Sequence, residues 1–78
     1  MIPKLRAALA SRVIVEQAKG FLRETLDVSV EDAFGVLRAY ARANGEHLTV
    51  VARRLMTDRH ARPVLVAAIA EFATPPTS

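Results

Sequence analysis

The first third of the chain carries apolar residues at helical spacing. Between Pro3 and about Leu26 only Gly20 is a poor helix former, so nothing else interrupts a helix there. The apolar positions that share one face are Ile14, Ala18, Phe21 and Leu22. They follow the i, i+4, i+7, i+8 spacing of an amphipathic helix. The pattern therefore predicts one long first helix.

A second helix is predicted to begin after Ser29. The Ser29 hydroxyl can accept a hydrogen bond from a free N–H group of the first turn, and two acidic residues follow where negative charge favours a helix N-terminus. The helix should run from Val30 to about Ala43, where Asn44 and Gly45 end it. Its predicted inward face is Ala33, Leu37, Tyr40 and Ala41, flanked by Val30, Phe34 and Val36.

Two further helices complete the pattern. The third would turn Leu48, Val51, Ala52 and Leu55 inward. The fourth would begin at Pro63, because proline suits the first turn of a helix, and would end near Ala73. These elements predict an all-α fold: a compact three-helix bundle with a long first helix and an additional C-terminal helix.

The composition is that of a small intracellular globular domain, with 78 residues, 51% of them apolar and none of them cysteine. Such a chain is too small for a deep substrate cleft, and it cannot use disulfides or thiolate-bound metal. No apolar run of signal-peptide length follows Lys4 and Arg6, and no run is long enough to cross a bilayer, so we expect neither a signal peptide nor a membrane span. The expected location is the cytoplasm.

Two apolar stripes lie outside the faces that a closed three-helix core would bury. Ile2, Leu5, Leu9 and Val13 lie on a second face of the first helix, turned away from its main apolar face. The fourth helix is apolar all round, with Glu71 as its only charge. Either the fourth helix folds back over Leu5 and Leu9 within one chain, or the four stripe residues and the C-terminal helix join two chains in a symmetric homodimer. We favour the homodimer.

Basic residues give the chain a net charge of +3 and fall on more than one helix. Arg12, Lys19 and Arg23 share one side of the first helix, opposite its main apolar face, and Glu16 between them neutralises part of their field. Two interpretations remain open: a solvated face with weak ion pairs, or a contact for a polyanion. Residues on later helices that would extend such a contact are Arg38, Arg42, Arg53 and Arg54.

Gly20 lies inside the predicted first helix, where glycine lowers helix stability by about 1 kcal/mol relative to alanine. A specific packing or binding role would explain why it is there. Close approach of another helix or of a nucleic-acid backbone would supply one, and a tolerated glycine is the alternative. Phe34 and Tyr40 have rings that can stack on an unpaired base. Their spacing is more typical of core residues, and we expect Tyr40 in the core.

No arrangement of side chains points to catalysis. His47 and His60 have no cysteine or carboxylate at ligand spacing, so no metal is expected. The sequence has no phosphate-binding glycine loop and no Ser/His/Asp arrangement with flanking glycines. We therefore expect no enzyme activity, no catalytic residue, no cofactor and no small-molecule substrate.

Several short patterns occur together between about Arg12 and Leu55. They are Arg12 with Ile14, Ala18-Lys19-Gly20, Leu22, Ser29 with Ala33-Phe34, Leu37-Arg38, Ala41, Asn44, Leu48 and Val51-Ala52. With these residues the chain resembles the ANTAR family of bacterial transcription antitermination domains, compact three-helix bundles that bind hairpins in nascent RNA. The resemblance implies RNA binding that stops a terminator hairpin from forming, with dimers that present two surfaces to a pair of hairpins.

On this resemblance the predicted organisation has four parts: an N-terminal helical extension over 1–11, an ANTAR-like RNA-binding domain over 12–60, an additional helix over 61–73 and a disordered tail over 74–78. The residues expected to contact phosphates or bases are Arg12, Lys19, Arg38, Asn44, Arg53 and Arg54, with Arg23 and Arg42 peripheral. Family members commonly carry basic residues where this chain has Gly45-Glu46-His47, and Arg-Asp where it has Thr49-Val50. The cationic density near the third helix is therefore lower than the family pattern.

Two other functions are compatible with the sequence. The first is a protein-interaction module that has lost RNA binding and pairs with a larger sensor protein through its apolar stripes. The second is a DNA-binding helix-turn-helix domain. We rank it last, because Thr49, Val50 and Arg53 are a poor set for reading base edges.

Overall fold

The computed structural model describes residues 3–73 and, within them, the side chains from residue 9 onward. This part of the chain forms four helices and no strand: α1 (Pro3–Leu26), α2 (Val30–Ala43), α3 (Leu48–Thr57) and α4 (Arg62–Ala70). The predicted all-α class and the bounds of the first two helices are confirmed. The fourth helix starts one residue earlier than expected and stops before Ala73.

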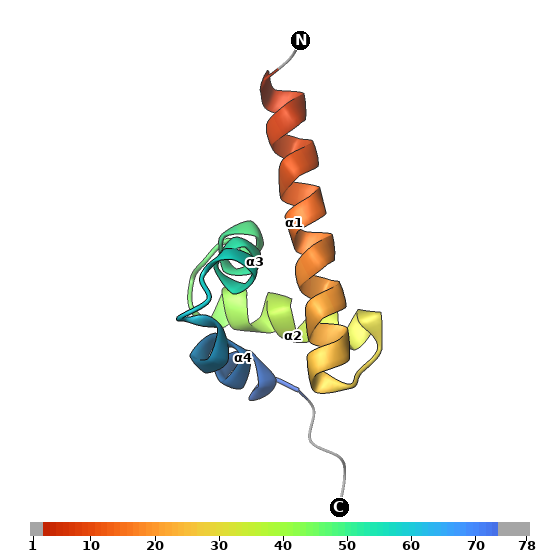
Figure 1. The fold of residues 1–78 in the computed structure, drawn as a ribbon, viewed down its shortest axis with the longest axis vertical. Coiled ribbons are helices and arrows are strands. Elements are labelled where there is room, and N and C mark those ends of the chain that lie inside the picture. Colours follow the sequence, from red (N-terminus) through yellow and green to blue (C-terminus); the bar gives the residue numbers. More distant parts are fainter. Residues whose placement is uncertain (1–2, 74–78) are drawn as a thin grey trace, which may run out of the picture.

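The C-terminal half of α1 packs on α3 and α2, and α4 closes the bundle against α2 and α3. The N-terminal half of α1 extends beyond the other three helices (Figure 1). The core residues come from all four helices: Ala18, Leu22, Ala33, Val36, Leu37, Ala41, Val51, Ala52, Leu55, Leu65 and Ile69. Tyr40 is half-buried and packs against this core, as expected from its spacing.

The ends of α2 follow from local chemistry. The Ser29 hydroxyl accepts a hydrogen bond of 3.1 Å from the backbone N–H of Asp32, which is the predicted N-cap. At the other end, Asn44 Nδ2 donates to the carbonyl of Tyr40 at 2.9 Å. Gly45 follows with φ of +62°, a left-handed conformation that glycine adopts without a Cβ clash and that ends the helix.

The intrachain explanation for the apolar stripes is wrong, because α4 lies on α2 and α3 and leaves Leu9 56% exposed. Leu65 and Ile69 bury α4 in the shared core, and Arg62 adds a polar link to α3. Its Nε donates to the carbonyl of Leu55 at 2.8 Å and its terminal nitrogen donates to that of Met56 at 2.9 Å, so α4 is fixed to the end of α3. Of the predicted dimer contacts, Ile2 and the side chain of Leu5 lie outside the described part of the structure, as does the predicted tail over 74–78.

Candidate nucleic-acid interface

Two cations from different helices meet over one aromatic ring at the junction of α1 and α2. Lys19 Nζ on α1 lies 4.8 Å from the centroid of the Phe34 ring, and the guanidinium carbon of Arg38 on α2 lies 5.2 Å from it. Both distances are within the range of cation–π attraction. Phe34 and Arg38 are one helical turn apart, and α1 brings Lys19 to the same ring. We call Lys19, Phe34 and Arg38 the Phe34 cluster.

Lys19 is more enclosed than its sequence position suggested. Its side chain is only 20% exposed, and Nζ donates a hydrogen bond of 3.0 Å to Oε1 of Glu16. The stem covers apolar surface at the helix junction while the ammonium stays at the edge, which is common for lysine. The sequence analysis set Lys19 on a stripe opposite the main apolar face of the first helix, and the structure instead encloses its side chain at the junction of α1 and α2. Arg12 and Arg23 are exposed, as predicted.

The outer face of α2 continues the basic surface. A shallow groove of about 270 Å³ there is lined by Gly35, Arg38, Ala39, Arg42 and Ala43. Its two arginines lie one turn apart along the helix. Arg38 belongs to both the groove and the Phe34 cluster. The structure therefore brings two predicted residues, Lys19 and Arg38, to one ring, and Arg38 shares the α2 groove with the peripheral Arg42.

Arg54 is held by a partner that the sequence had marked as a departure from the family pattern. Its two terminal nitrogens donate to the two carboxylate oxygens of Glu46, at 3.0 and 2.6 Å. This hydrogen-bonded pair lowers the pKa of Glu46 and raises the pKa of Arg54. Glu46 thus fastens the loop before α3 to that helix. Both terminal nitrogens of the Arg54 guanidinium already donate to this carboxylate.

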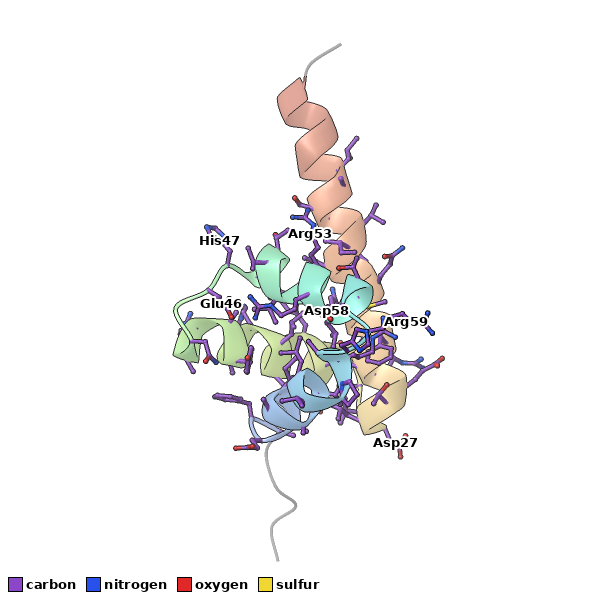
Figure 2. The ribbon with its side chains drawn as sticks, turned by 60° about the vertical axis from the view of Figure 1, so that its left-hand side comes forward. Asp27, Glu46, His47, Arg53, Asp58 and Arg59 are labelled. Carbon is purple, nitrogen blue, oxygen red and sulfur yellow. The ribbon has the colours of Figure 1, made fainter. Side chains whose placement is uncertain are left out.

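The remaining predicted contacts are spread over the surface. Asn44 uses its amide nitrogen to cap α2, as described above. Arg53 is exposed on α3 (Figure 2). In the described part of the chain, no hydrogen bond, ion pair or cation–π contact links Arg53 or Arg12 to the Phe34 cluster.

Sequence reasoning missed the contacts of Lys19 and Arg38 with the Phe34 ring and the pairing of Glu46 with Arg54. One signal was present for the first, because an aromatic residue and an arginine four positions apart on a helix are neighbours. No such signal existed for Glu46 and Arg54, since their contact spans a loop.

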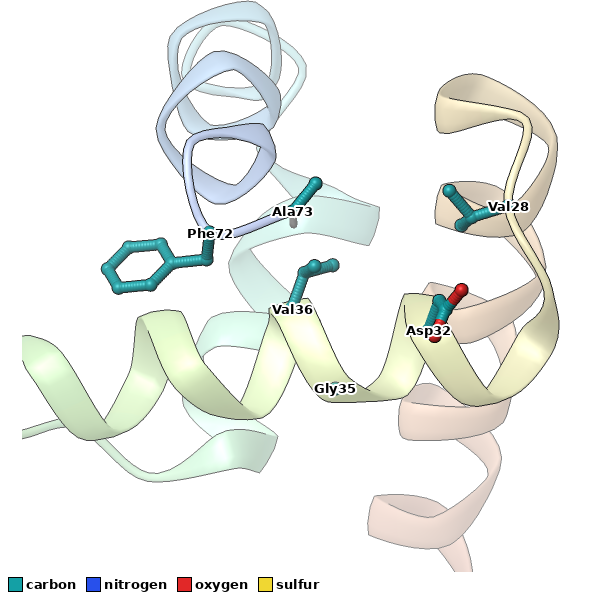
Figure 3. A pocket seen from close by; sticks show the side chains of 6 residues that line it. All are labelled: Val28, Asp32, Gly35, Val36, Phe72 and Ala73. Carbon is teal, nitrogen blue, oxygen red and sulfur yellow. The ribbon is translucent and has the colours of Figure 1, made fainter. Parts of the chain in front are cut away.

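The other concave places offer no catalytic chemistry. A groove of about 380 Å³ lies between α2 and the end of α4, and its lining is Val28, Asp32, Gly35, Val36, Phe72 and Ala73 (Figure 3). Asp32 is its only titratable group, and a lone carboxylate has no partner for acid–base or nucleophilic work. Within residues 3–73 no three metal-ligating side chains gather, and none of the helices there has the length and apolarity to cross a membrane.

Comparison with known proteins gives one result. The family model described as ANTAR domain matches residues 4–56, which is more than half of the chain. Neither the curated proteins nor the solved structures include a significant match. ANTAR domains are helical, and the family is one of RNA-binding antitermination regulators and not one of enzymes. This chain belongs to the ANTAR domain family.

Proposed function

We propose that this chain binds stem-loops in nascent RNA through the surface at the junction of α1 and α2, and that binding prevents a terminator hairpin from forming. The observation that carries the proposal is the convergence of Lys19 and Arg38 on Phe34, with Arg42 one turn further along α2. A protein that acts on nascent transcripts in bacteria works in the cytoplasm.

The chemistry of the Phe34 cluster suits a structured RNA. Cations spaced along a surface neutralise successive phosphates, and their binding energy comes largely from released counterions. The guanidinium plane of Arg38 and the Phe34 ring also offer flat faces on which an unpaired loop base can stack. Phosphate contacts would set the position of the hairpin, and the stacked base would favour a loop over a continuous duplex.

The other predicted residues contribute to different degrees in this proposal. Arg12 and Arg53 are exposed and free to approach phosphates outside the Phe34 cluster. Asn44 keeps its side-chain oxygen for a base edge while its nitrogen caps α2. Arg54 contributes least, because Glu46 occupies both arms of its fork, whereas Lys19 gives Glu16 a single hydrogen bond and keeps its other N–H groups for a phosphate.

The test uses a hairpin RNA selected from a library of stem-loops with randomised loops, titrated at several salt concentrations. Lys19→Glu and Arg38→Glu should each weaken binding strongly. Each should also lower the salt slope, which is the steepness with which the logarithm of the binding constant falls with the logarithm of the salt concentration. The slope should drop by about 0.7 to 0.9 for each phosphate that the variant no longer neutralises. Phe34→Leu keeps an apolar side chain but removes the ring, and it should weaken binding with little change in slope.

The matched control is Arg59→Glu, the same reversal of charge at an exposed position between α3 and α4. It should leave the salt slope unchanged. Circular dichroism checks that every variant keeps its helices. Equal losses of affinity for Arg59→Glu and Lys19→Glu would contradict the assigned surface, and the absence of any saturable binding at low salt would contradict RNA binding itself.

The second candidate is the protein-interaction module. It is favoured by the exposure of Leu9 and Val13 on α1, at 56% and 54%. A pull-down with this chain from a cell lysate, with and without nuclease, separates the two functions. If the chain binds RNA, nuclease should abolish the recovery of its partners. If it binds a protein directly, nuclease should leave that recovery unchanged.

A further inference from the structure

The groove between α2 and the end of α4 holds one carboxylate among apolar side chains. Val28 and Asp32 lie on one side of it, and Val36 and Ala73 lie on the other (Figure 3). Its volume of about 380 Å³ falls within the range of about 300 to 1,000 Å³ that is usual for small-ligand pockets. We call this place the Asp32 groove. It can take one flat, mostly apolar group and offers that group a single charge.

The Asp32 carboxylate is available to a ligand. Asp32 is exposed in the first turn of α2, and the Ser29 hydroxyl bonds to its backbone N–H and not to its side chain. In the described part of the chain, no hydrogen bond or ion pair engages this carboxylate. An ionised carboxylate accepts hydrogen bonds and donates none. The groove therefore favours a ligand whose edge carries N–H donors.

The Asp32 groove adjoins the shallow groove that contains Arg38 and Arg42. Gly35 lines both grooves, and a Cβ built on it would meet nothing in the described chain within 4 Å. Arg38 also lies over the Phe34 ring, so the Asp32 groove is continuous with the proposed RNA surface. Asp32 and Arg38 are six residues apart, which is about 9 Å along the helix axis. The surface thus changes from cationic to anionic within two turns of α2.

We propose that the Asp32 groove binds one unpaired base of the RNA loop, and that this base carries an exocyclic amine, as adenine, cytosine and guanine do. The inference rests on the proposed RNA-binding function. Arg38 and Arg42 hold phosphates of the loop strand, and the next part of the strand brings a base to Asp32. The amine donates a hydrogen bond to the carboxylate. Uracil has a carbonyl oxygen where cytosine has its amine, so the carboxylate repels that edge.

Charge complementarity favours a base over other occupants. A carboxylate repels a phosphate, whereas Val28 and Val36 offer apolar contact to the ring of a base. The adjacent arginines attract a phosphate-bearing strand and not an uncharged peptide. Loop bases are unstacked and leave their pairing edges free, which the bases of a continuous duplex do not. The groove thus adds a base preference to a surface whose phosphate contacts carry none.

Hairpins that differ by one amine test the site. The probe is the hairpin selected above, with each loop base replaced in turn by a counterpart without the amine: cytosine by uracil, adenine by purine and guanine by hypoxanthine. At one loop position the unchanged chain should bind the amine-free RNA about 10-fold to 100-fold more weakly, as expected for a hydrogen bond to a charged group. The two RNAs of each pair have the same charge, so their affinity ratio is independent of the phosphate contacts.

Asp32→Ala should bring this ratio close to one, because the acceptor of the amine is gone. Glu31→Ala is the matched control. It removes a carboxylate from the adjacent position in the same turn of α2, and Glu31 is exposed and does not line the groove. Glu31→Ala should keep the full ratio. Circular dichroism checks that both variants keep their helices.

The base site and the RNA-binding function can fail separately. If no loop position responds to loss of the amine, as for a groove that holds a protein segment, the base site is overturned. A ratio that Asp32→Ala leaves unchanged overturns it too. Both results are compatible with the losses expected for Lys19→Glu and Arg38→Glu, which would keep the proposed function. If no hairpin binds the unchanged chain with saturation, the proposed function and the base site are both wrong.

Discussion

At the scale of single residues, Glu46 shows how one carboxylate changes what an arginine can do. The hydrogen bonds from Arg54 hold the pKa of Glu46 below its ordinary value of 4.5. A group with a lowered folded-state pKa stabilises the fold above its unfolded pKa, and this contribution is lost as the pH falls through the folded value. The contribution of Glu46 to the free energy of unfolding should therefore be complete at neutral pH and be lost as the pH falls through 4.5 and below.

Glu46→Gln isolates this contribution, since it keeps the shape of the side chain but cannot titrate. Chemical denaturation across the acidic range should show a shallower loss of stability in Glu46→Gln than in the unchanged chain. Identical pH profiles would mean that the Glu46–Arg54 pair adds nothing to stability in solution.

Two glycines of this chain should respond to the same substitution with opposite signs. Gly35 lies inside α2 and Gly45 follows it with a φ of +62°, and a Cβ at either position would meet nothing in the described chain within 4 Å. Gly35→Ala should raise the free energy of unfolding by about 1 kcal/mol through helix propensity. Gly45→Ala should lower it by about 1 to 2 kcal/mol, because the left-handed conformation strains an alanine. Thermal unfolding of both variants compares them directly, and a shared sign would contradict the backbone argument.

At the scale of helices, Arg62 fastens α4 to the bundle. It donates to two carbonyls at the end of α3, and its guanidinium carbon lies 5.5 Å from the centroid of the Phe21 ring on α1. Arg62→Ala removes these interactions and should lower the free energy of unfolding by about 1.5 to 3 kcal/mol, as for hydrogen bonds to a charged group. Arg62→Lys should recover only part of this stability, because lysine lacks the planar fork. Full recovery by lysine in urea denaturation would show that charge alone matters.

The helices could be predicted from the sequence because each depends on local features, such as the spacing of Ala18 and Leu22 or the cap at Ser29. The docking of α4 could not, since it depends on which neighbours bury Leu65 and Ile69 and on hydrogen bonds that Arg62 makes across a turn. The candidate site divides in the same way. Arg38 was found from its position on a helix, whereas the partial enclosure of Lys19 and the pairing of Arg54 arise only when helices or loops meet.

At the scale of the whole molecule, a pair of chains would carry two Phe34 clusters. An RNA with two hairpins would then bind both, and the second contact would form at a high effective concentration. The expected gain over a single hairpin is on the order of 100-fold, provided that the linker between the hairpins spans the two clusters.

Leu9→Asp tests this expectation, because it places a charge in the apolar strip of α1 far from the Phe34 cluster. The variant should bind a single hairpin as well as the unchanged chain does, but it should lose most of its preference for the double hairpin. Titration of both RNAs against both proteins at one salt concentration measures the two ratios. If Leu9→Asp kept the full preference while sedimenting as a monomer, the advantage of two hairpins would have to come from one chain, and the pairing through α1 would have no part in RNA recognition.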